Sequence, residues 1–302
     1  MRKVTIALTG GLGNQLFQLA AALSFAQGGT VEIMTKPGRP RLNSDGDPEL
    51  FSFVLPPNVK IVSSGYFTKF LSKVIGFNLR SGYSPKRFEL MLSPLIRFLS
   101  SITIFLLTGK LRKVIVGQDL GYSEKLRLGK RTFLIGYFQS YKYVSSIKKE
   151  QFVKNLKHPK SRINEYVNFA ELEQPLIVHV RLGDYRLEES FGILGQEYYQ
   201  ANCKKLWETK NYLKIWLFSD EPEEAIKMIP QELARHVRII DSDGLSSAET
   251  LKLMTFGKGY LTANSTFSWW GAWLNPNPNK IIIAPKQWFS TDKFDTKDLV
   301  PE

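Results

Sequence analysis

The sequence predicts an α/β fold with two Rossmann-like domains, whose parallel sheets face each other across a cleft. Two observations lead to this prediction: compact apolar runs with the length of buried strands recur along the chain, and segments with helical spacing lie between them. The 302 residues suit two domains of about 100–200 residues each. We expect an N-terminal domain over residues 1–165 and a C-terminal domain over residues 166–302, which meet near residues 155–175 and bind a ligand between them.

The N-terminal domain is predicted to open with a strand, a glycine turn and a helix. Val4–Leu8 is a compact run rich in β-branched residues that ends at Gly10 and Gly11, and apolar residues recur at helical spacing over residues 14–26. Residues 1–8 imitate the start of a signal peptide, but the apolar run is short, so an opening strand is the better interpretation.

The rest of this half is less regular. Residues 36–58 are rich in Pro, Gly and Asp and predict a loop, whereas residues 63–109 carry apolar clusters compatible with helices. Residues 91–108 are the most hydrophobic stretch, but Pro94 and Arg97 interrupt it, and it falls short of the ~20 apolar residues that span a bilayer. We therefore expect a buried or interfacial helix there.

The C-terminal half repeats the alternation of strand and helix. Four apolar runs read as buried strands, with helical candidates between them: residues 176–180, 213–218, 237–240 and 280–284. Only His179 interrupts the first of these runs. Strands that alternate with helices indicate a parallel sheet with helices on its faces.

The net charge limits the classes of binding partner, and the cysteine content indicates the redox compartment. The formal charge of +13 attracts polyanions such as nucleotides, acidic lipids, phosphorylated carriers or nucleic acid. Nucleic acid is disfavoured, because Lys and Arg are spread along the chain and no nucleic-acid-binding motif is present. The single cysteine, Cys203, cannot form an intrachain disulfide, which fits a reducing compartment and a small core residue.

The first candidate site is the glycine-rich loop over residues 10–15. It lies between a predicted strand and a predicted helix, where small residues such as Gly11 and Gly13 would let backbone amides and a helix N-terminus approach an anionic or sugar ligand. The dinucleotide fingerprint would need a third glycine where Leu16 stands, but Glu32 follows at nearly the distance of a ribose-binding acid. A nicotinamide-dependent dehydrogenase, and a turn that only packs tightly, remain alternatives.

The second candidate site follows the predicted strand over residues 176–180. Arg181 supplies a planar, permanently charged fork suited to a diphosphate, and Asp184 would hold that fork or bind a ribose or base. His179 is equally compatible with a ligand role and with a satisfied core position. An Arg–Asp pair that serves only as an interdomain salt bridge is the alternative to a binding site.

The third candidate site is a polar turn that begins at Asn264. Its side chains and amides would cap the following helix and hold phosphate, and they comprise Asn264, Ser265, Thr266, Phe267 and Ser268. Trp270 and Trp273 are expected to pack in the core, whereas the role of Trp269 stays open.

No metal site is expected. Residues 45–47 and 241–243 both have the Asp-x-Asp pattern, but such triplets are common by chance, and a solvated turn is favoured because neither has an obvious further ligand. His and Cys do not occur with zinc-site spacing, and the sequence has no G-x-S-x-G motif and no P-loop.

Five ordered segments together resemble the bacterial α-1,2-fucosyltransferases of glycosyltransferase family 11. They are residues 10–20, the central G-Y-F-Q-S-Y-K-Y of residues 136–143, residues 179–185, which are similar to the family's H-x-R-R-G-D-Y, residues 218–221 and residues 264–274. The resemblance spans most of the chain. It implies a GT-B architecture, GDP-fucose as donor, inversion at the anomeric carbon and no required metal or other cofactor.

The same resemblance implies roles for individual residues. Catalytic roles fall to Arg181, Asp184 and Asn14. Donor binding is implied for Gly11, Gly13, Asn14, His179, Arg181, Ser219, Asp220, Asn264, Ser265, Thr266, Phe267 and Ser268, and acceptor binding for Gln139, Tyr185 and Trp269.

The chain departs from the family pattern at two places. Leu182 stands where a second Arg is usual, which removes a cation that would help to neutralise the leaving group. Arg181 would then have to neutralise the leaving group alone. Thr250 stands where the family often has an Asp before Met254, with Glu249 adjacent, so a nucleoside contact there is doubtful.

The expected reaction is inverting, metal-independent transfer of L-fucose from GDP-β-L-fucose to the 2-hydroxyl of a terminal β-galactoside. Asp184 and Glu188 are the candidate general bases. The expected partners are GDP-fucose and a galactose-terminated or lipid-linked glycan, with no nucleic acid, in the cytoplasm and in peripheral contact with the anionic inner face of the plasma membrane. The alternatives are an α-1,6- or protein O-fucosyltransferase, a nicotinamide-dependent dehydrogenase and a basic binding module without catalysis.

Overall fold

A computed structural model describes the chain over residues 1–35, 38–62, 98, 102, 113–116, 122, 129–153, 155–159, 161–187, 192–209, 212–241 and 244–289. Most of residues 63–109, including all of the hydrophobic stretch over 91–108 except residues 98 and 102, lies outside these ranges. Among the described residues, no helix has the length and apolar character to cross a membrane. The chain divides into two compact units, a first unit from Met1 to Asn155 and a second unit that begins at Leu156.

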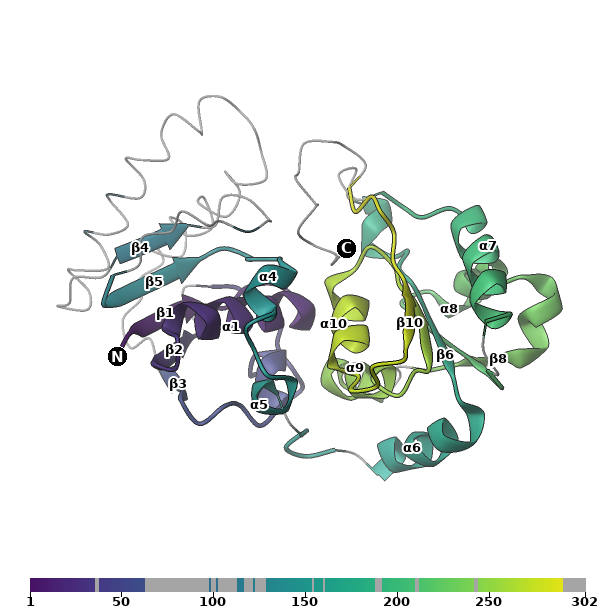
Figure 1. Cartoon of the computed structure of the whole chain (residues 1–302), viewed down its shortest axis with the longest axis horizontal. Helices are drawn as coiled ribbons and strands as arrows, with labels where there is room; N and C mark the ends of the chain where they lie inside the picture. Colours follow the sequence, from purple (N-terminus) through teal and green to yellow (C-terminus); the bar gives the residue numbers. More distant parts are fainter. Residues whose placement is uncertain are drawn as a thin grey trace. The chain divides into compact units, whose positions relative to one another are not determined.

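The first unit contains a five-stranded parallel sheet in the order β3-β2-β1-β5-β4. The strands are β1 (Lys3–Ala7), β2 (Thr30–Met34), β3 (Val59–Val62), β4 (Lys113–Val116) and β5 (Arg131–Ile135). The helices described in this unit are α1 (Leu12–Ala26), the 3-10 helix η1 (Glu49–Ser52), α4 (Tyr141–Val144) and α5 (Lys149–Phe152) (Figure 1). β1 lies at the centre, with Lys3 opposite Thr30 on one side and Arg131 on the other.

Helix α1 shows why the N-terminal sequence folds as it does. Most of its apolar residues are fully buried, including Leu16, Phe17 and Leu19. The helix ends at Gln27, whose left-handed backbone (φ 47°) lets its N–H reach the carbonyl of Leu23, and Gly28 follows with φ 80°. The expected strand, glycine turn and helix are therefore confirmed.

The second unit also contains a five-stranded parallel sheet, in the order β10-β9-β6-β7-β8. The strands are β6 (Leu176–Val180), β7 (Ile215–Ser219), β8 (Val237–Ile239), β9 (Gly259–Leu261) and β10 (Ile281–Ile283). Counted from β6, this is the Rossmann order 3-2-1-4-5, read from β8 to β10. The helices are α6 (Ser161–Glu173), η2 (Asp184–Leu187), α7 (Gln196–Trp207), α8 (Pro222–Ala225), η3 (Ile226–Met228), η4 (Gln231–His236), α9 (Ser247–Met254) and α10 (Thr266–Leu274).

Strand β6 is buried on both faces, and its residues alternate between two cores. Leu176, Val178 and Val180 belong to the core that includes α7 and α8. Ile177 belongs to the core that includes α6, α9 and α10 on the opposite face (Figure 1). A strand buried in this way requires the continuous apolar run seen in the sequence.

The predicted α/β class with two Rossmann-like units is confirmed. The four strands expected in the C-terminal half correspond to β6, β7, β8 and β10. The predicted loop over residues 36–58 holds only η1 among its described residues. Cys203 is a buried core residue, as expected, and burial raises the pKa of its thiol to about 12.

Candidate functional site

The strand order of the second unit makes the carboxyl end of β6 the candidate ligand site. The order reverses between β6 and its neighbour β9, and open parallel sheets bind ligands at such switch points. Arg181 follows β6 directly, Asp220 follows β7, and the turn with Asn264 follows β9. Three of the sequence motifs therefore meet at one edge of one sheet.

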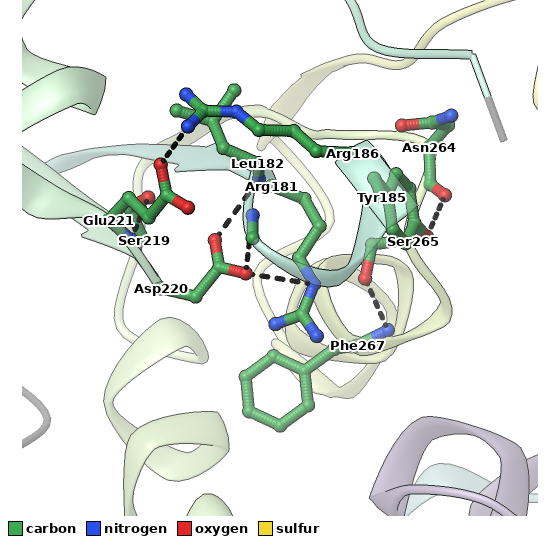
Figure 2. Close-up of polar contacts among 11 residues, drawn as sticks. Arg181, Leu182, Tyr185, Arg186, Ser219, Asp220, Glu221, Asn264, Ser265 and Phe267 are labelled. Atoms are coloured by element: carbon green, nitrogen blue, oxygen red, sulfur yellow. Dashed lines mark hydrogen bonds and ion pairs between the residues drawn. The ribbon is translucent and has the colours of Figure 1, made fainter. Parts of the chain in front are cut away.

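Asp220 binds the loop that carries Arg181. Its Oδ1 accepts a hydrogen bond from the N–H of Leu182 at 3.1 Å, and its Oδ2 accepts one from the N–H of Gly183 at 3.0 Å. Its Oδ2 also forms an ion pair with Nε of Arg181 at 3.4 Å (Figure 2). Both partners of this ion pair, Arg181 and Asp220, belong to the second unit, so this pair does not join the two units.

The side chain of Leu182 points away from the guanidinium of Arg181 (Figure 2). Leu182 continues the alternation of β6 and joins the core that contains Val180 and Tyr199, where it is 1% exposed. Consecutive residues of an extended chain face opposite sides. Position 182 in this chain therefore provides an apolar core residue, and its direction argues against the expectation that leucine removes a cation from beside Arg181.

His179 lies beneath this loop, on the face of β6 that α10 covers. Its ring centroid is 6.2 Å from that of Phe267, and the residue is 5% exposed. Burial and the nearby charge of Arg181 lower its pKa to about 3 against the opposing effect of Asp220, so the imidazole is neutral at pH 7. Its Nδ1 is buried without a hydrogen-bond partner among the described residues, whereas buried polar atoms normally have one.

The turn after β9 forms the second wall of the site. Ser265 caps α10 by accepting a hydrogen bond from the N–H of Phe267, so the amides of the first turn of α10 lie at this edge of the sheet. Thr266 opens the helix, and the buried Ser268 donates its hydroxyl to the carbonyl of Ser265. The predicted cap is therefore present.

Two side chains fix this turn to the rest of the unit. The amide of Asn264 donates to the carbonyls of Gly192 and Trp288, so Asn264 links the turn to both of these segments. The hydroxyl of Tyr185 donates to the carbonyl of Asn264 at 2.9 Å, while the guanidinium carbon of Arg181 lies 5.9 Å from the Tyr185 ring (Figure 2). Tyr185 thus links the loop after β6 to the turn after β9.

The remaining predicted residues of this unit have varied positions. Ser219 accepts a hydrogen bond from the N–H of Glu221 beside Asp220. Trp269 is 7% exposed and stacks on Trp273 within the tryptophan cluster of α10. Asp184 opens η2, but its side chain lies outside what the structure describes, as does the whole of Glu188.

The first unit has its own switch point, between β1 and β5. Gly11 caps α1, Gly13 and Asn14 lie in the first turn of that helix, and Gln139 follows β5. The amide of Gln139 donates to Oδ1 of Asn14 at 2.7 Å, across 125 residues of sequence. The structure thereby joins Asn14 with Gln139, two residues to which the sequence assigned different roles.

Gln15 and Gln18 are buried glutamines whose roles sequence reasoning missed. Gln15 donates to the carbonyls of Gly10 and Arg41 and accepts from the N–H of Leu50, which ties the glycine loop to the segment after β2. Gln18 joins Thr9 to Gly136 in the same way. Their position in the first two turns of an otherwise apolar helix was the available signal, because buried amides need partners.

The acidic residues of the alternative interpretations have structural partners. Glu32 lies in the middle of β2, where it accepts from Thr5 and pairs with Lys3, so it is remote from the carboxyl end where a ribose would bind. Glu249 forms a capping box with Ser246 at the start of α9. Its carboxylate caps the helix in place of the nucleoside contact that was doubtful there.

The first acidic triplet forms an exposed turn. The side chain of Asn43 accepts from the N–H groups of Asp45 and Asp47. The second triplet lies partly outside the described residues. Among the described residues, three or more His, Cys, Asp or Glu side chains are nowhere grouped so as to hold a metal ion.

The chain is a two-unit α/β protein. One sheet carries a glycine loop, and the other carries an arginine beside a capped helix N-terminus; both arrangements are typical of sites for phosphorylated ligands. The profile of glycosyl transferase family 11 matches residues 119–300, more than half of the chain. The chain therefore belongs to glycosyltransferase family 11, and its class of reaction is glycosyl transfer.

Individual proteins with related sequences or folds are known. The chain is 26% identical to an Escherichia coli alpha-1,2-colitosyltransferase over 324 aligned positions, which cover 100% of this chain and 98% of the relative. It is 32% identical to the E. coli O-antigen biosynthesis glycosyltransferase WbnK over 37% of this chain and 38% of the relative. The solved fucosyltransferase NodZ from Bradyrhizobium aligns at 17% identity with a TM-score of 0.47, over 91% of this chain and 94% of NodZ.

Proposed function

We propose that the protein transfers L-fucose from GDP-β-L-fucose to the 2-hydroxyl of a terminal β-galactoside, with inversion and without a metal ion. The observation that carries the proposal is the convergence of Arg181, the buried Nδ1 of His179 and the capped N-terminus of α10 at the switch point of the second unit. This combination supplies a cation, a neutral hydrogen-bonding group and backbone amides for a diphosphate. Family membership supports a sugar nucleotide as the source of this diphosphate.

The proposed mechanism follows from where charge develops. The acceptor hydroxyl attacks the anomeric carbon on the face opposite GDP, and negative charge grows on the β-phosphate as the glycosidic bond breaks. Arg181 and the amides at the start of α10 would stabilise this charge. The Nδ1 of neutral His179 can donate or accept a hydrogen bond, according to its tautomer, without adding charge.

The two units are proposed to divide the substrates. Residues 166–302 would bind GDP-fucose, and residues 1–165 would provide the acceptor side through Asn14 and Gln139. Their mutual hydrogen bond holds both amides at the switch point of the first sheet, which supports a sugar-binding role because amides donate to and accept from hydroxyls. Asp184 and Glu188 remain the proposed general bases.

A colitosyl donor is the second candidate, because the full-length relative is named an α-1,2-colitosyltransferase. Colitose differs from fucose by the absence of the hydroxyl at C3. A site built to bond that hydroxyl would reject colitose strongly, whereas a site without such a contact would accept both sugars. A panel of GDP-fucose and GDP-colitose with β-galactoside acceptors, followed by linkage determination, distinguishes the two donors and also detects α-1,6 transfer.

The proposed acceptor is a galactose-terminated glycan, carried on a lipid at the cytoplasmic face of an anionic membrane. The net charge of +13 supports this location through attraction to acidic headgroups. Co-sedimentation with vesicles should increase with the fraction of anionic lipid and decrease with salt. Equal binding to neutral and anionic vesicles would contradict this part of the proposal.

The test of the proposed function compares two arginines from one loop. Arg186 follows Arg181 by five positions, is half exposed and pairs with Glu221. Figure 2 shows its side chain running to Glu221, away from the guanidinium of Arg181. We expect Arg181→Ala to lose about 3–5 kcal/mol of transition-state stabilisation, seen in kcat/KM for GDP-fucose, whereas Arg186→Ala retains most activity.

Wild-type turnover by folded Arg181→Ala, or failure of the wild-type protein to bind GDP in calorimetry, would overturn the proposed function. The metal-independent part has its own test. EDTA-treated enzyme is expected to keep its activity, and strict dependence on added Mn²⁺ or Mg²⁺ would overturn it.

A further inference from the structure

We infer that Asp220 is a positioning residue that orients Arg181 for the donor diphosphate and acts on GDP affinity through that arginine. The inference rests on the proposed function and adds a role to it: Asp220 would serve the diphosphate indirectly, through contacts within the protein. The resulting arrangement is a carboxylate after β7 that fixes a cation after β6.

The contacts of Asp220 fix both the backbone and the side chain of the arginine loop. The N–H groups of Leu182 and Gly183 donate to its two carboxylate oxygens, at 3.1 and 3.0 Å, and Arg181 contributes Nε at 3.4 Å. Bonds from consecutive amides to one carboxylate leave the loop little rotational freedom. The orientation of Arg181 therefore depends on a residue 38 positions from Leu182 in the sequence.

The ion pair engages the Nε side of the guanidinium. Figure 2 shows the end of the guanidinium with its two terminal nitrogens pointing toward Phe267 in the first turn of α10, beyond the Nε that contacts Asp220. A guanidinium binds a diphosphate through pairs of N–H groups, so this contact does not use the edge formed by the terminal nitrogens. The side chains of Arg181 and Asp220 are each only 24% exposed, which limits solvent screening of the pair.

Gly183 shows how tightly the carboxylate fits. A Cβ at this position would lie 2.6 Å from Oδ2 of Asp220, closer than atoms of the two side chains can approach. Glycine is therefore required for the carboxylate to reach both amides. Because Gly183→Ala changes no charge, it perturbs the same contacts by an independent route.

The neighbouring Glu221 provides a matched control. It is also an acid in the turn after β7, with a side chain 30% exposed, but it pairs with Arg186, whose side chain points away from that of Arg181. Glu221→Gln removes a carboxylate of similar exposure without touching the contacts of Asp220. A general effect of lost negative charge would appear in both variants.

The deciding experiment is a double-mutant cycle on GDP affinity, measured by calorimetry with GDP titrated to millimolar concentration. The four proteins are wild type, Asp220→Asn, Arg181→Ala and the double variant. We expect Asp220→Asn to weaken GDP binding about tenfold or more in the wild-type background, because a carboxylate that accepts charged and backbone donors is lost. In the Arg181→Ala background the same change should alter the affinity less than about twofold.

Each outcome has a distinct meaning. Equal weakening by Asp220→Asn in both backgrounds, or a similar loss in Glu221→Gln, would overturn the positioning role while leaving the proposed function intact. If Asp220→Asn fails to fold, Gly183→Ala replaces it in the cycle with the same expectation. Absence of GDP binding by the wild-type protein would overturn the proposed function and this inference together.

Discussion

Replacing Leu182 by arginine, which restores the residue usual in the family pattern, is expected to destabilise the second unit without adding a cation beside Arg181. The side chain of residue 182 lies in the core shared with Val180 and Tyr199 and is 1% exposed. An arginine introduced there would place its guanidinium among apolar groups on the opposite face of the strand from Arg181. The direction of the side chain therefore decides the outcome.

The expected magnitude follows from this burial. Loss of a fully buried leucine removes about 1.5–3 kcal/mol of hydrophobic stabilisation. An unpaired guanidinium in the same place costs several kcal/mol more. The total of about 5 kcal/mol matches the lower end of the about 5–15 kcal/mol that stabilises a typical domain. Leu182→Met, which conserves volume, should cost less than about 1.5 kcal/mol.

Urea denaturation followed by fluorescence would measure these differences, with GDP affinity determined on the folded fraction. We expect the midpoint of Leu182→Arg to fall sharply, with no gain in GDP affinity. A variant that unfolds at the wild-type urea concentration and binds GDP more tightly would show that residue 182 faces the ligand. That result would refute the assignment of the two faces of β6.

Two further predictions concern buried polar groups. The pKa of His179 is lowered from 6.5 to about 3 in the folded protein. Between pH 6.5 and about pH 3 the unfolded chain therefore binds a proton at this residue that the folded chain does not bind. The free energy of unfolding consequently falls as the pH is lowered through this window. His179→Gln should flatten that dependence in urea titrations at several pH values, and equal slopes for the two proteins would contradict it. Gln15→Leu removes the side-chain amide that hydrogen-bonds the carbonyls of Gly10 and Arg41 and the N–H of Leu50. We expect the free energy of unfolding to fall by about 3 kcal/mol. Chemical denaturation measures this loss, and an unchanged free energy would contradict the prediction.

Local pattern predicted much of the second unit. The uninterrupted apolar run of β6 is what a strand buried on both faces requires, and Ser265 before an apolar segment correctly indicated a capped helix. Arg181 could be placed at the carboxyl end of a strand because strand ends are readable from sequence. The short strands β2, β3, β4 and β5 were missed; in β2 the charged Glu32 interrupts the apolar run.

The contacts that organise the site could not be predicted in the same way, because they join residues far apart in sequence. Nothing in the order of residues 181–185 shows that the ion-pair partner of Arg181 is Asp220. The direction of Leu182 depends on whether the extended chain continues two residues past β6, which is a property of the folded strand. Pairings such as that between Gln139 and Asn14 depend on strand order, which sequence pattern alone leaves open.

The order of strands in the first unit also determines when its site can form during synthesis. β1 pairs with β5, so the centre of the sheet is complete only after Arg131 has been synthesised and can pair with Lys3. Until about residue 140 has left the ribosome, Asn14 lacks the amide of Gln139, and the backbone edge of β1 that pairs with β5 has no neighbour. Nascent chains that stall before this point would expose a strand edge beside a hydrophobic helix, which makes them substrates for chaperones and prone to aggregation.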